Sequence, residues 1–112
     1  MIGRIQSRSA FVRVRHEGVH IRSGPLSCTM LLDSSLAQPH VGYALGRHVG
    51  VAVRRNRLRR QLRVLLKAHE TLLSPGFYVF GASPQATKAT AQQLAAAVEN
   101  IAQSCRSKAS QS

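Results

Sequence analysis

Leucines at helical spacing, interleaved with arginines, constrain the fold of this chain more than any other feature. The apolar positions continue until Ser74-Pro75-Gly76 ends the run, and they are Val51, Leu58, Leu62, Leu65, Leu66, Leu72 and Leu73. At about 100° per residue, one side of such a helix carries Val51, Leu58, Leu62 and Leu65, and the opposite side carries Asn56, Arg60, Arg63 and Lys67. The pattern predicts a long amphipathic helix over residues 51–73 with a basic back.

The segments around this helix predict a mixed fold. We expect a first helix over residues 7–15, with Ser7 or Ser9 as its N-cap and Gly18 at its end. Strand-like patterns predict three strands in an antiparallel meander, at residues 19–21, 26–32 and 41–45. An aromatic run predicts a strand at residues 77–80, and alanine-rich residues 90–104 predict a closing helix. The order α-β-β-β-α-β-α predicts a two-layer α+β sandwich.

The length of 112 residues suits one domain, which we place at residues 1–105, with residues 106–112 as a polar, disordered tail. No run approaches the ~20 apolar residues of a spanning helix, and no signal-like segment follows Met1, so we expect no membrane partner. The two cysteines, Cys28 and Cys105, lie far apart without any CxxC, which predicts neither a zinc module nor a disulfide framework. Reduced thiols in a cytoplasm are the simplest account of them.

The charge balance predicts a polyanionic partner. Sixteen Lys and Arg residues oppose four Asp and Glu residues, and thirteen of the sixteen are Arg. Arginine presents a planar fork of donors that matches phosphate oxygens and guanine edges and also stacks on bases, which favours nucleic acid. A surface that is basic only for solubility is the plain alternative, but a balanced surface would repel itself less.

Six of these arginines fall within residues 54–63 without one acid. Like charges at i,i+4 and cations near a helix N-terminus each cost a few tenths of a kcal/mol or more, so stability alone would not select the band. A phosphate backbone removes the repulsion, and the helix N-terminus adds free N–H donors. The band therefore predicts contact with RNA or DNA. Asn56, uncharged among the arginines, either caps a local turn, reads a base or a sugar hydroxyl, or is a surface residue of no consequence.

One apparent metal motif fails on its context. The segment His16-Glu17-Gly18-Val19-His20 matches H-E-x-x-H, which in metalloproteases places two zinc ligands and a general base on one helical face. The glycine and the β-branched valine interrupt any helix there, and a third ligand at workable spacing is absent. No phosphate-binding glycine motif occurs around residues 46–50, and the acids are too few for a two-metal carboxylate site. We therefore expect neither an autonomous nuclease nor a protein-bound metal.

A more specific motif overlaps the start of the long helix. It is a basic loop followed by V-G-x-A-V-x-R-N-R-hydrophobic-K/R-R-x-hydrophobic-R, and the segment GRHVGVAVRRNRLRRQLR matches it in register at Val49-Gly50, Ala52-Val53, Arg55-Asn56-Arg57, Arg59-Arg60 and Arg63. On this motif the chain resembles the bacterial ribonuclease P protein component. The resemblance covers nearly the whole chain, since Arg4-Ile5, Phe11 and Gly18 look like the family's first helix, Phe77-Tyr78-Val79 like its fourth strand, and the alanine-rich end like its last helix.

The resemblance implies the same order of elements, in a fold similar to domain two of ribosomal protein S5, with a left-handed crossover through the arginine helix. It implies the non-catalytic protein subunit of an endoribonuclease ribonucleoprotein. Such a subunit binds the catalytic RNA and the 5′ leader of precursor tRNA. The RNA, with Mg²⁺, hydrolyses the phosphodiester that frees the mature tRNA 5′ end. A cytoplasmic protein is implied, and no protein ligand is assigned to Mg²⁺.

Carried over position by position, the motif implies contacts with the RNA subunit from Arg47, His48, Arg54, Arg55, Asn56, Arg57, Arg59, Arg60 and Arg63. His48 stands where the family usually has Lys, and an unperturbed histidine is largely neutral at pH 7. The leader cleft, between the first helix and the sheet, maps to Phe11, Arg15 and Thr29. Arg15 replaces an aromatic residue, so the cleft has less π surface, and Phe11 has plain core packing as its alternative.

Two other classes of protein are weighed beside this one, a structural RNA-binding protein of the ribosomal type and a DNA-binding regulator. A helix-turn-helix needs a second helix a short turn away, whereas Pro75-Gly76 and a strand follow the arginine helix. We therefore expect RNA and not DNA. Stimulation of precursor-tRNA cleavage separates the ribonuclease P reading from the ribosomal one.

Overall fold

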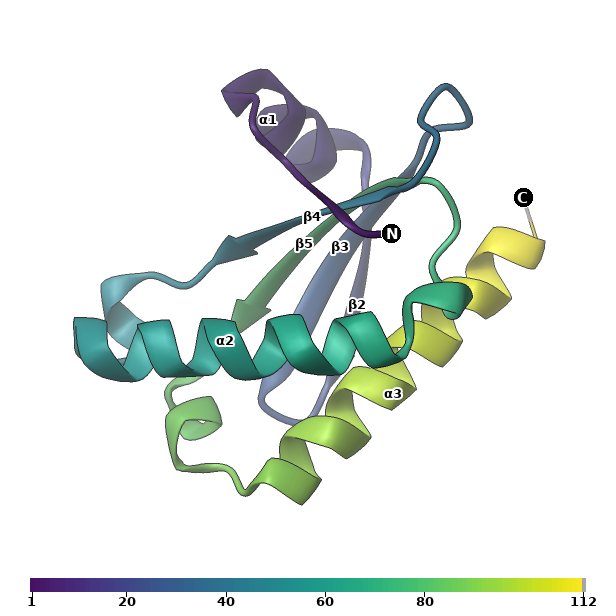
Figure 1. Cartoon of the computed structure of the whole chain (residues 1–112). Coiled ribbons are helices and arrows are strands. Elements are labelled where there is room, and N and C mark those ends of the chain that lie inside the picture. The colour runs from purple at the N-terminus through teal and green to yellow at the C-terminus, as the bar shows by residue number, and fades with distance from the viewer. Residues whose placement is uncertain (112) are drawn as a thin grey trace.

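A five-stranded mixed sheet in the order β1-β4-β5-β3-β2 forms the centre of the computed structural model, which describes residues 1–111 (Figure 1). The strands are β1 (Gly3–Arg4), β2 (Val19–Ser23), β3 (Leu26–Leu32), β4 (Pro39–Ala44) and β5 (Gly76–Ala82). The helices are α1 (Arg8–Glu17), α2 (Ala52–Ala68) and α3 (Ala91–Ser110), with the 3-10 turns η1 (Arg47–Val49), η2 (Glu70–Leu72) and η3 (Pro84–Lys88). The predicted α+β order is confirmed, and the two-residue strand β1 precedes it.

The predicted antiparallel meander of the first three long strands is wrong. β2 and β3 do form an antiparallel pair, but β4 does not continue it. β5 lies between them, antiparallel to β3 and parallel to β4. The physical reason is that β5 is an aromatic strand, buried at Tyr78 and Phe80, which is stabilised best at the centre of the sheet. The chain thus crosses from β4 through α2 into the parallel strand β5.

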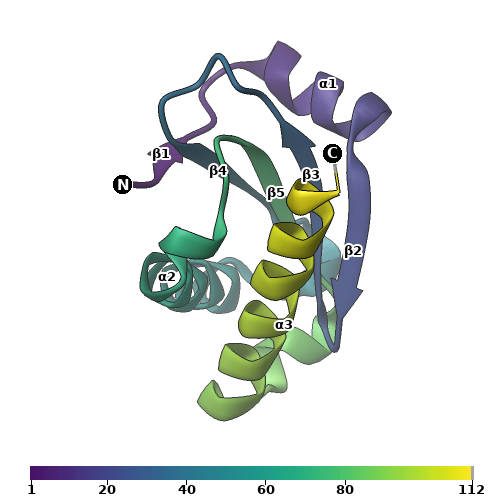
Figure 2. The ribbon, with the colours of Figure 1, turned by 90° about the vertical axis from the view of Figure 1, so that its right-hand side faces the viewer.

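Helices α2 and α3 both cover one face of the sheet (Figure 2). Every second residue of β3 and β5 is buried against them, as the period of two in a strand requires. One continuous core joins the sheet to both helices and includes Cys28, Met30, Tyr78, Phe80, Leu58, Leu62, Leu66, Leu94, Val98 and Ile101. The alternate strand positions are turned to the other side of the sheet. We call this side the open face, and its residues include His20, Thr29, His40, Gly42, Phe77 and Val79.

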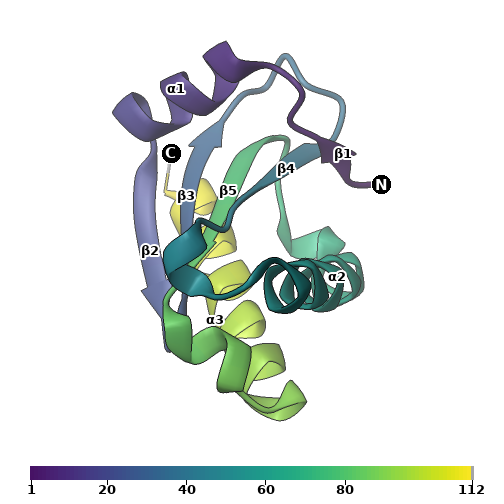
Figure 3. The same cartoon turned by 90° about the vertical axis from the view of Figure 1, so that its left-hand side faces the viewer.

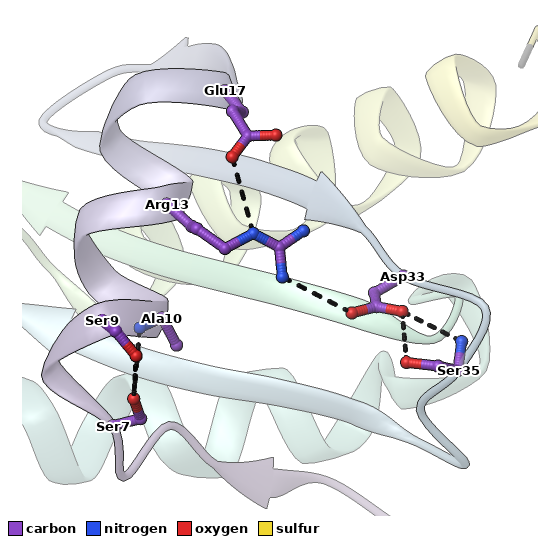
Figure 4. A network of polar contacts seen from close by, with 7 residues as sticks. All are labelled: Ser7, Ser9, Ala10, Arg13, Glu17, Asp33 and Ser35. Carbon is purple, nitrogen blue, oxygen red and sulfur yellow. Dashed lines mark hydrogen bonds and ion pairs between the residues drawn. The ribbon is translucent and has the colours of Figure 1, made fainter.

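Helix α1 lies over one end of the open face (Figure 3). Ser7 caps it, as predicted, by accepting a hydrogen bond from the backbone N–H of Ala10 at 3.3 Å. The guanidinium of Arg13 lies 3.5 Å from Glu17 on the same helix and 3.9 Å from Asp33, so the second of these pairs links α1 to the loop after β3 (Figure 4). These contacts hold α1 in register with the sheet, although each exposed pair contributes little stability.

The ends of the two long helices differ from prediction. Val51 is 66% exposed and serves as the N-cap of α2, and Leu66 takes its place in the buried stripe with Leu58 and Leu62. The helix ends at Ala68, and the turn η2 carries the chain on toward Pro75. α3 does not end at Ser104 but continues to Ser110, because Cys105 is buried in the core and extends the apolar side of the helix. Residues 106–110 are therefore helical, and residue 112, the last of the predicted tail, lies outside the described residues.

The two cysteines, far apart in the sequence, are neighbours in the core. Cys28 on β3 and Cys105 on α3 are both buried free thiols, and they share a side-chain hydrogen bond. That contact, together with burial, raises the pKa of Cys28 well above its usual value. The pair packs α3 against the sheet.

Gly18, between α1 and β2, is the position where we expect the fold to tolerate a side chain least. A Cβ there would lie 2.4 Å from the carbonyl oxygen of Val14 and 2.6 Å from Cγ2 of Thr29. Gly18→Ala should therefore lower the free energy of unfolding by about 1–3 kcal/mol, measured by urea denaturation.

Gly46→Ala is the matched control, because its new methyl group would meet only the exposed ring of His48, at 3.0 Å. Equal urea midpoints for the two variants would show that the backbone around Gly18 can accommodate a methyl group without loss of stability.

Candidate nucleic-acid interface

The approach to α2 is a fixed, basic turn. Val49 is 1% exposed and anchors η1, while Arg47 and His48 beside it are exposed. Gly50 follows with φ 156°, a conformation that other residues rarely adopt, and it turns the chain into the helix. Val51, the N-cap, makes no side-chain capping bond, and the first turn contains no acid. The first N–H groups of α2 therefore keep their capacity to bind an anion.

A basic surface extends along the outside of α2 from this turn. Its exposed predicted residues are Arg54, Asn56, Arg57, Arg60 and Arg63. Within residues 1–111, none of these five side chains forms an ion pair with an acid, so no carboxylate neutralises the four arginines. Val53, 77% exposed, adds apolar area among them. The surface combines concentrated positive charge with flat stacking groups, which suits a nucleic-acid backbone.

Arg55 differs from the other arginines of the motif, because its side chain is bound within the protein. Its Nε donates to the carbonyl oxygen of Gly50 at 3.1 Å, and its Nη1 donates to that of Leu45 at 3.3 Å. The position of Arg55 around the axis of α2 already indicates this structural role. At about 100° per residue, Arg55 falls between Leu58 and Leu66, on the inner side of the helix. Arg55 therefore ties the first turn of α2 to the end of β4.

Asn56 has a partner that none of its predicted roles included. Its Oδ1 accepts a hydrogen bond from Nη1 of Arg59 at 2.8 Å, one turn further along the helix. Arg59 is half-buried, whereas Asn56 is exposed. The amide thus restrains the guanidinium of Arg59, while its own nitrogen has no hydrogen bond within the described residues.

The predicted leader residues lie on or beside the open face. A Cβ at Gly42 would lie 2.5 Å from Cζ of Phe11, so the ring of Phe11 rests directly on β4. Thr29 lies on the same face, two strands away, and its hydroxyl is 3.2 Å from Nδ1 of His20. Arg15 is exposed one turn of α1 beyond Phe11. The three predicted residues therefore all lie on or beside the open face of the sheet.

Sequence reasoning missed the aromatic residues between them. Phe77 and His40 are neighbours on β5 and β4, and their rings meet edge to face with centroids 6.0 Å apart. Both are half-buried on the open face. These two rings add π surface to that of Phe11 on this face, while Arg15 still stands in place of an aromatic residue. The signal was the parallel register of β4 and β5, which no local pattern contains.

The H-E-x-x-H segment is divided between two elements. His16 and Glu17 end α1, whereas His20 lies in β2. The described chain contains no group of three His, Cys, Asp or Glu side chains placed to hold a metal ion. Among its helices, none combines the length and apolar character that crossing a membrane requires.

Solved structures of other proteins share this fold. The RNase P protein of Staphylococcus aureus superposes with a TM-score of 0.80 at 20% identity, covering 88% of this chain and 90% of that one. The RNase P protein of Thermotoga maritima gives a TM-score of 0.79 at 17% identity, covering 89% and 94%. Fold and surface together define an α+β protein with a long basic helix on its surface.

Comparison with known sequences identifies the family of this chain more specifically than the fold does. The model of the family Ribonuclease P matches residues 3–106. A ribonuclease P protein component from a Pseudanabaena species is 31% identical over 100 residues, 88% of this chain and 86% of that protein. One from Symbiobacterium thermophilum is 31% identical over 83 residues, covering 74% and 72%.

The chain therefore belongs to the ribonuclease P protein family, the protein component of the endoribonuclease ribonucleoprotein that processes tRNA 5′ ends.

Two arginines of α2 should separate a structural role from an RNA-binding role. Arg55→Ala leaves the carbonyls of Leu45 and Gly50 without their donor, so it should lower the free energy of unfolding by about 1–3 kcal/mol. Arg60→Ala, at an exposed position, should leave stability within about 0.5 kcal/mol. It should instead reduce RNA affinity and flatten the dependence of log affinity on log salt.

Urea denaturation and a salt titration of RNA binding measure the two effects. If Arg55→Ala were as stable as the wild type and lost more salt dependence than Arg60→Ala, then Arg55 and not Arg60 would be the RNA contact.

Proposed function

We propose that the chain binds the catalytic RNA subunit of ribonuclease P through the basic surface of α2, and the 5′ leader of precursor tRNA through the open face. The observation that carries the first part is the row of exposed arginines without acidic partners. Such a row is self-repelling in the free protein, and an RNA backbone relieves the repulsion. Arg47 and His48, exposed on η1, extend the same surface.

The contribution to catalysis follows from charge. Enzyme RNA and precursor tRNA are both polyanions, so their approach is opposed by repulsion. A domain with a formal net charge of +12 placed between them reduces that repulsion. Its effect should be largest where few other cations are present.

The open face supports the second part of the proposal. Phe11, Phe77 and His40 offer rings of the kind on which unpaired bases stack, and Arg15 at the rim offers charge for a phosphate. Thr29 on β3 and His20 on the edge strand β2 add hydrogen-bonding groups to the same face. A single-stranded leader exposes both its bases and its backbone, and so it matches this mixture of groups.

Mg²⁺ belongs to the proposed reaction but not to the protein's own chemistry. The described residues do not bring together enough carboxylates to hold the ion, so we assign it no protein ligand. The metal would supply charge stabilisation at the reacting phosphate, where the RNA performs hydrolysis. We further propose that the protein works in the cytoplasm on RNA and does not act on DNA.

Reconstitution tests this function. At low Mg²⁺, adding the protein to a bacterial ribonuclease P RNA should increase cleavage of precursor tRNA at the mature 5′ end by at least about tenfold, because screening by the metal is then weakest. The rate of 5′-end formation is measured on a gel. The absence of stimulation over a range of salt concentrations would refute the assignment.

The leader contact has its own test at Phe11. Phe11→Leu keeps an apolar side chain on Gly42 but removes the ring, and it should weaken binding of precursor tRNA by about fivefold or more, in keeping with the loss of one base stack. Binding of mature tRNA, which has no leader, should not change.

Val12→Leu is the control, since Val12 is exposed on α1. Equal losses for precursor and mature tRNA in Phe11→Leu would show that Phe11 only packs.

A further inference from the structure

A large groove separates α2 from the edge of the sheet formed by β1 and β4. Its volume is about 1150 Å³. It shares Arg63 with the basic surface of α2 and Gly42 with the open face, and so it lies between the two. Its walls come from residues distant in sequence, and four of its lining side chains are cationic, namely Arg4, Arg59, Arg63 and Lys67. The one acid among the lining residues is Glu70, which contacts the amino group of Met1 at 3.2 Å.

The α2 wall holds its cations in a row. Arg59, Arg63 and Lys67 are spaced at i, i+4 and i+8, so each is displaced about 6 Å along the axis from the last. Such a row matches the repeat of phosphates along an extended strand. Arg59 is already restrained by Asn56 at 2.8 Å. The helix therefore offers a line of charges with one member fixed in place.

The opposite wall adds an aromatic residue and a further cation. Tyr43 on β4 is half-buried, and burial raises the pKa of its hydroxyl while the charges of Arg63 and Arg59 oppose that shift. Its hydroxyl also shares a hydrogen bond with Arg63. Arg4 on β1 lies at the rim. An aromatic ring between guanidinium groups is the kind of site that holds an unpaired nucleotide.

The groove is continuous with the open face. Ile5, Phe11 and Gly42 line it together with the residues of α2, so it begins where the ring of Phe11 rests on β4. A strand lying on the open face can pass this point and turn around the short strand β1 into the groove. A bend of this kind suits a flexible single strand better than a folded RNA.

We propose that this groove binds the upstream continuation of the 5′ leader, beyond the nucleotides held on the open face. Phosphates would contact Lys67, Arg63 and Arg4, and a base would stack against Tyr43. The inference rests on the proposed function for the identity of the strand. It makes affinity for precursor tRNA depend on leader length through Arg4 and Lys67, which are outside the set proposed to contact the RNA subunit, as well as through Arg63, which belongs to both.

Leader length provides the test. The reconstituted complex is given precursor tRNAs with leaders of about four or about twelve nucleotides, within the range of single-strand sites. Lys67→Gln and Arg4→Gln should each weaken binding of the long-leader substrate about three- to tenfold and leave the short-leader substrate unchanged. The salt slope for the long leader should fall by about 0.7 for each lost phosphate contact. Tyr43→Phe tests the hydroxyl bond to Arg63 without removing the ring.

Lys88→Gln and Arg106→Gln are matched controls on exposed positions outside the lining of the groove, and neither should distinguish the leaders. Unchanged long-leader affinity in Lys67→Gln and Arg4→Gln would overturn the proposal. Equal losses for both leaders would also overturn it, because the groove would then hold another part of the RNA.

A second measurement uses the isolated protein and a single-stranded RNA of about twelve nucleotides. Weaker binding of this RNA by the same two variants supports the groove, even if the wild-type chain fails to stimulate cleavage. Displacement by an acidic peptide but not by a second single strand would assign the groove to a protein partner and overturn the proposal. Failure of reconstitution thus counts against the proposed function, and failure of these variants counts against the groove.

Discussion

The packing of three leucines on α2 fixes the positions of the cations around them. Leu58, Leu62 and Leu66 are almost completely buried between the sheet and α3, and burial of each is worth about 1.5–3 kcal/mol. The repulsion between neighbouring arginines costs only a few tenths of a kcal/mol per pair. The apolar stripe therefore outweighs the self-repulsion, and the helix can carry a charge density that its own stability would oppose.

Because this stripe is narrow, the two flanks of α2 face different surroundings. The side turned to solvent carries Arg57 and Arg60, whereas the flank that faces the β1–β4 edge carries Arg59 and Arg63. Arg55, on the inner side, holds the first turn of the helix against the end of β4. A single rotation of the helix about its axis would move all of these groups together. The same packing thus sets the outer basic surface and the wall of the groove.

The spacing of the apolar residues and the arginine-rich motif predicted most of the helices and strands, because both signals depend on residues that are close together in the sequence. The helices, the strands at residues 19–21, 26–32 and 77–80, and the exposed arginines follow from such local signals. The place of β4 does not, because its partner β5 comes more than thirty residues later, after α2. The aromatic pair of His40 and Phe77 depends on that pairing and could not be predicted without it. The position of Arg55 around the helix axis already indicated that its side chain bonds within the protein. The match to the motif led us to assign it to RNA binding instead.

The arrangement also explains why the short strand β1 matters more than its length suggests. β1 pairs in parallel with β4 through Gly3 and Arg4, and Ile5 continues the contact by donating its N–H to Val41 at 3.1 Å. Without this strand β4 would be the edge of the sheet, and the groove beside α2 would lose the wall that holds Arg4. A Cβ on Gly3 would approach the side chain of Gln38 to 2.8 Å and that of His40 to 3.2 Å, so both side chains pack closely against β1 as well. The strand is therefore a fixed wall between the open face and the basic helix, and the proposed path of the leader from one to the other runs around it.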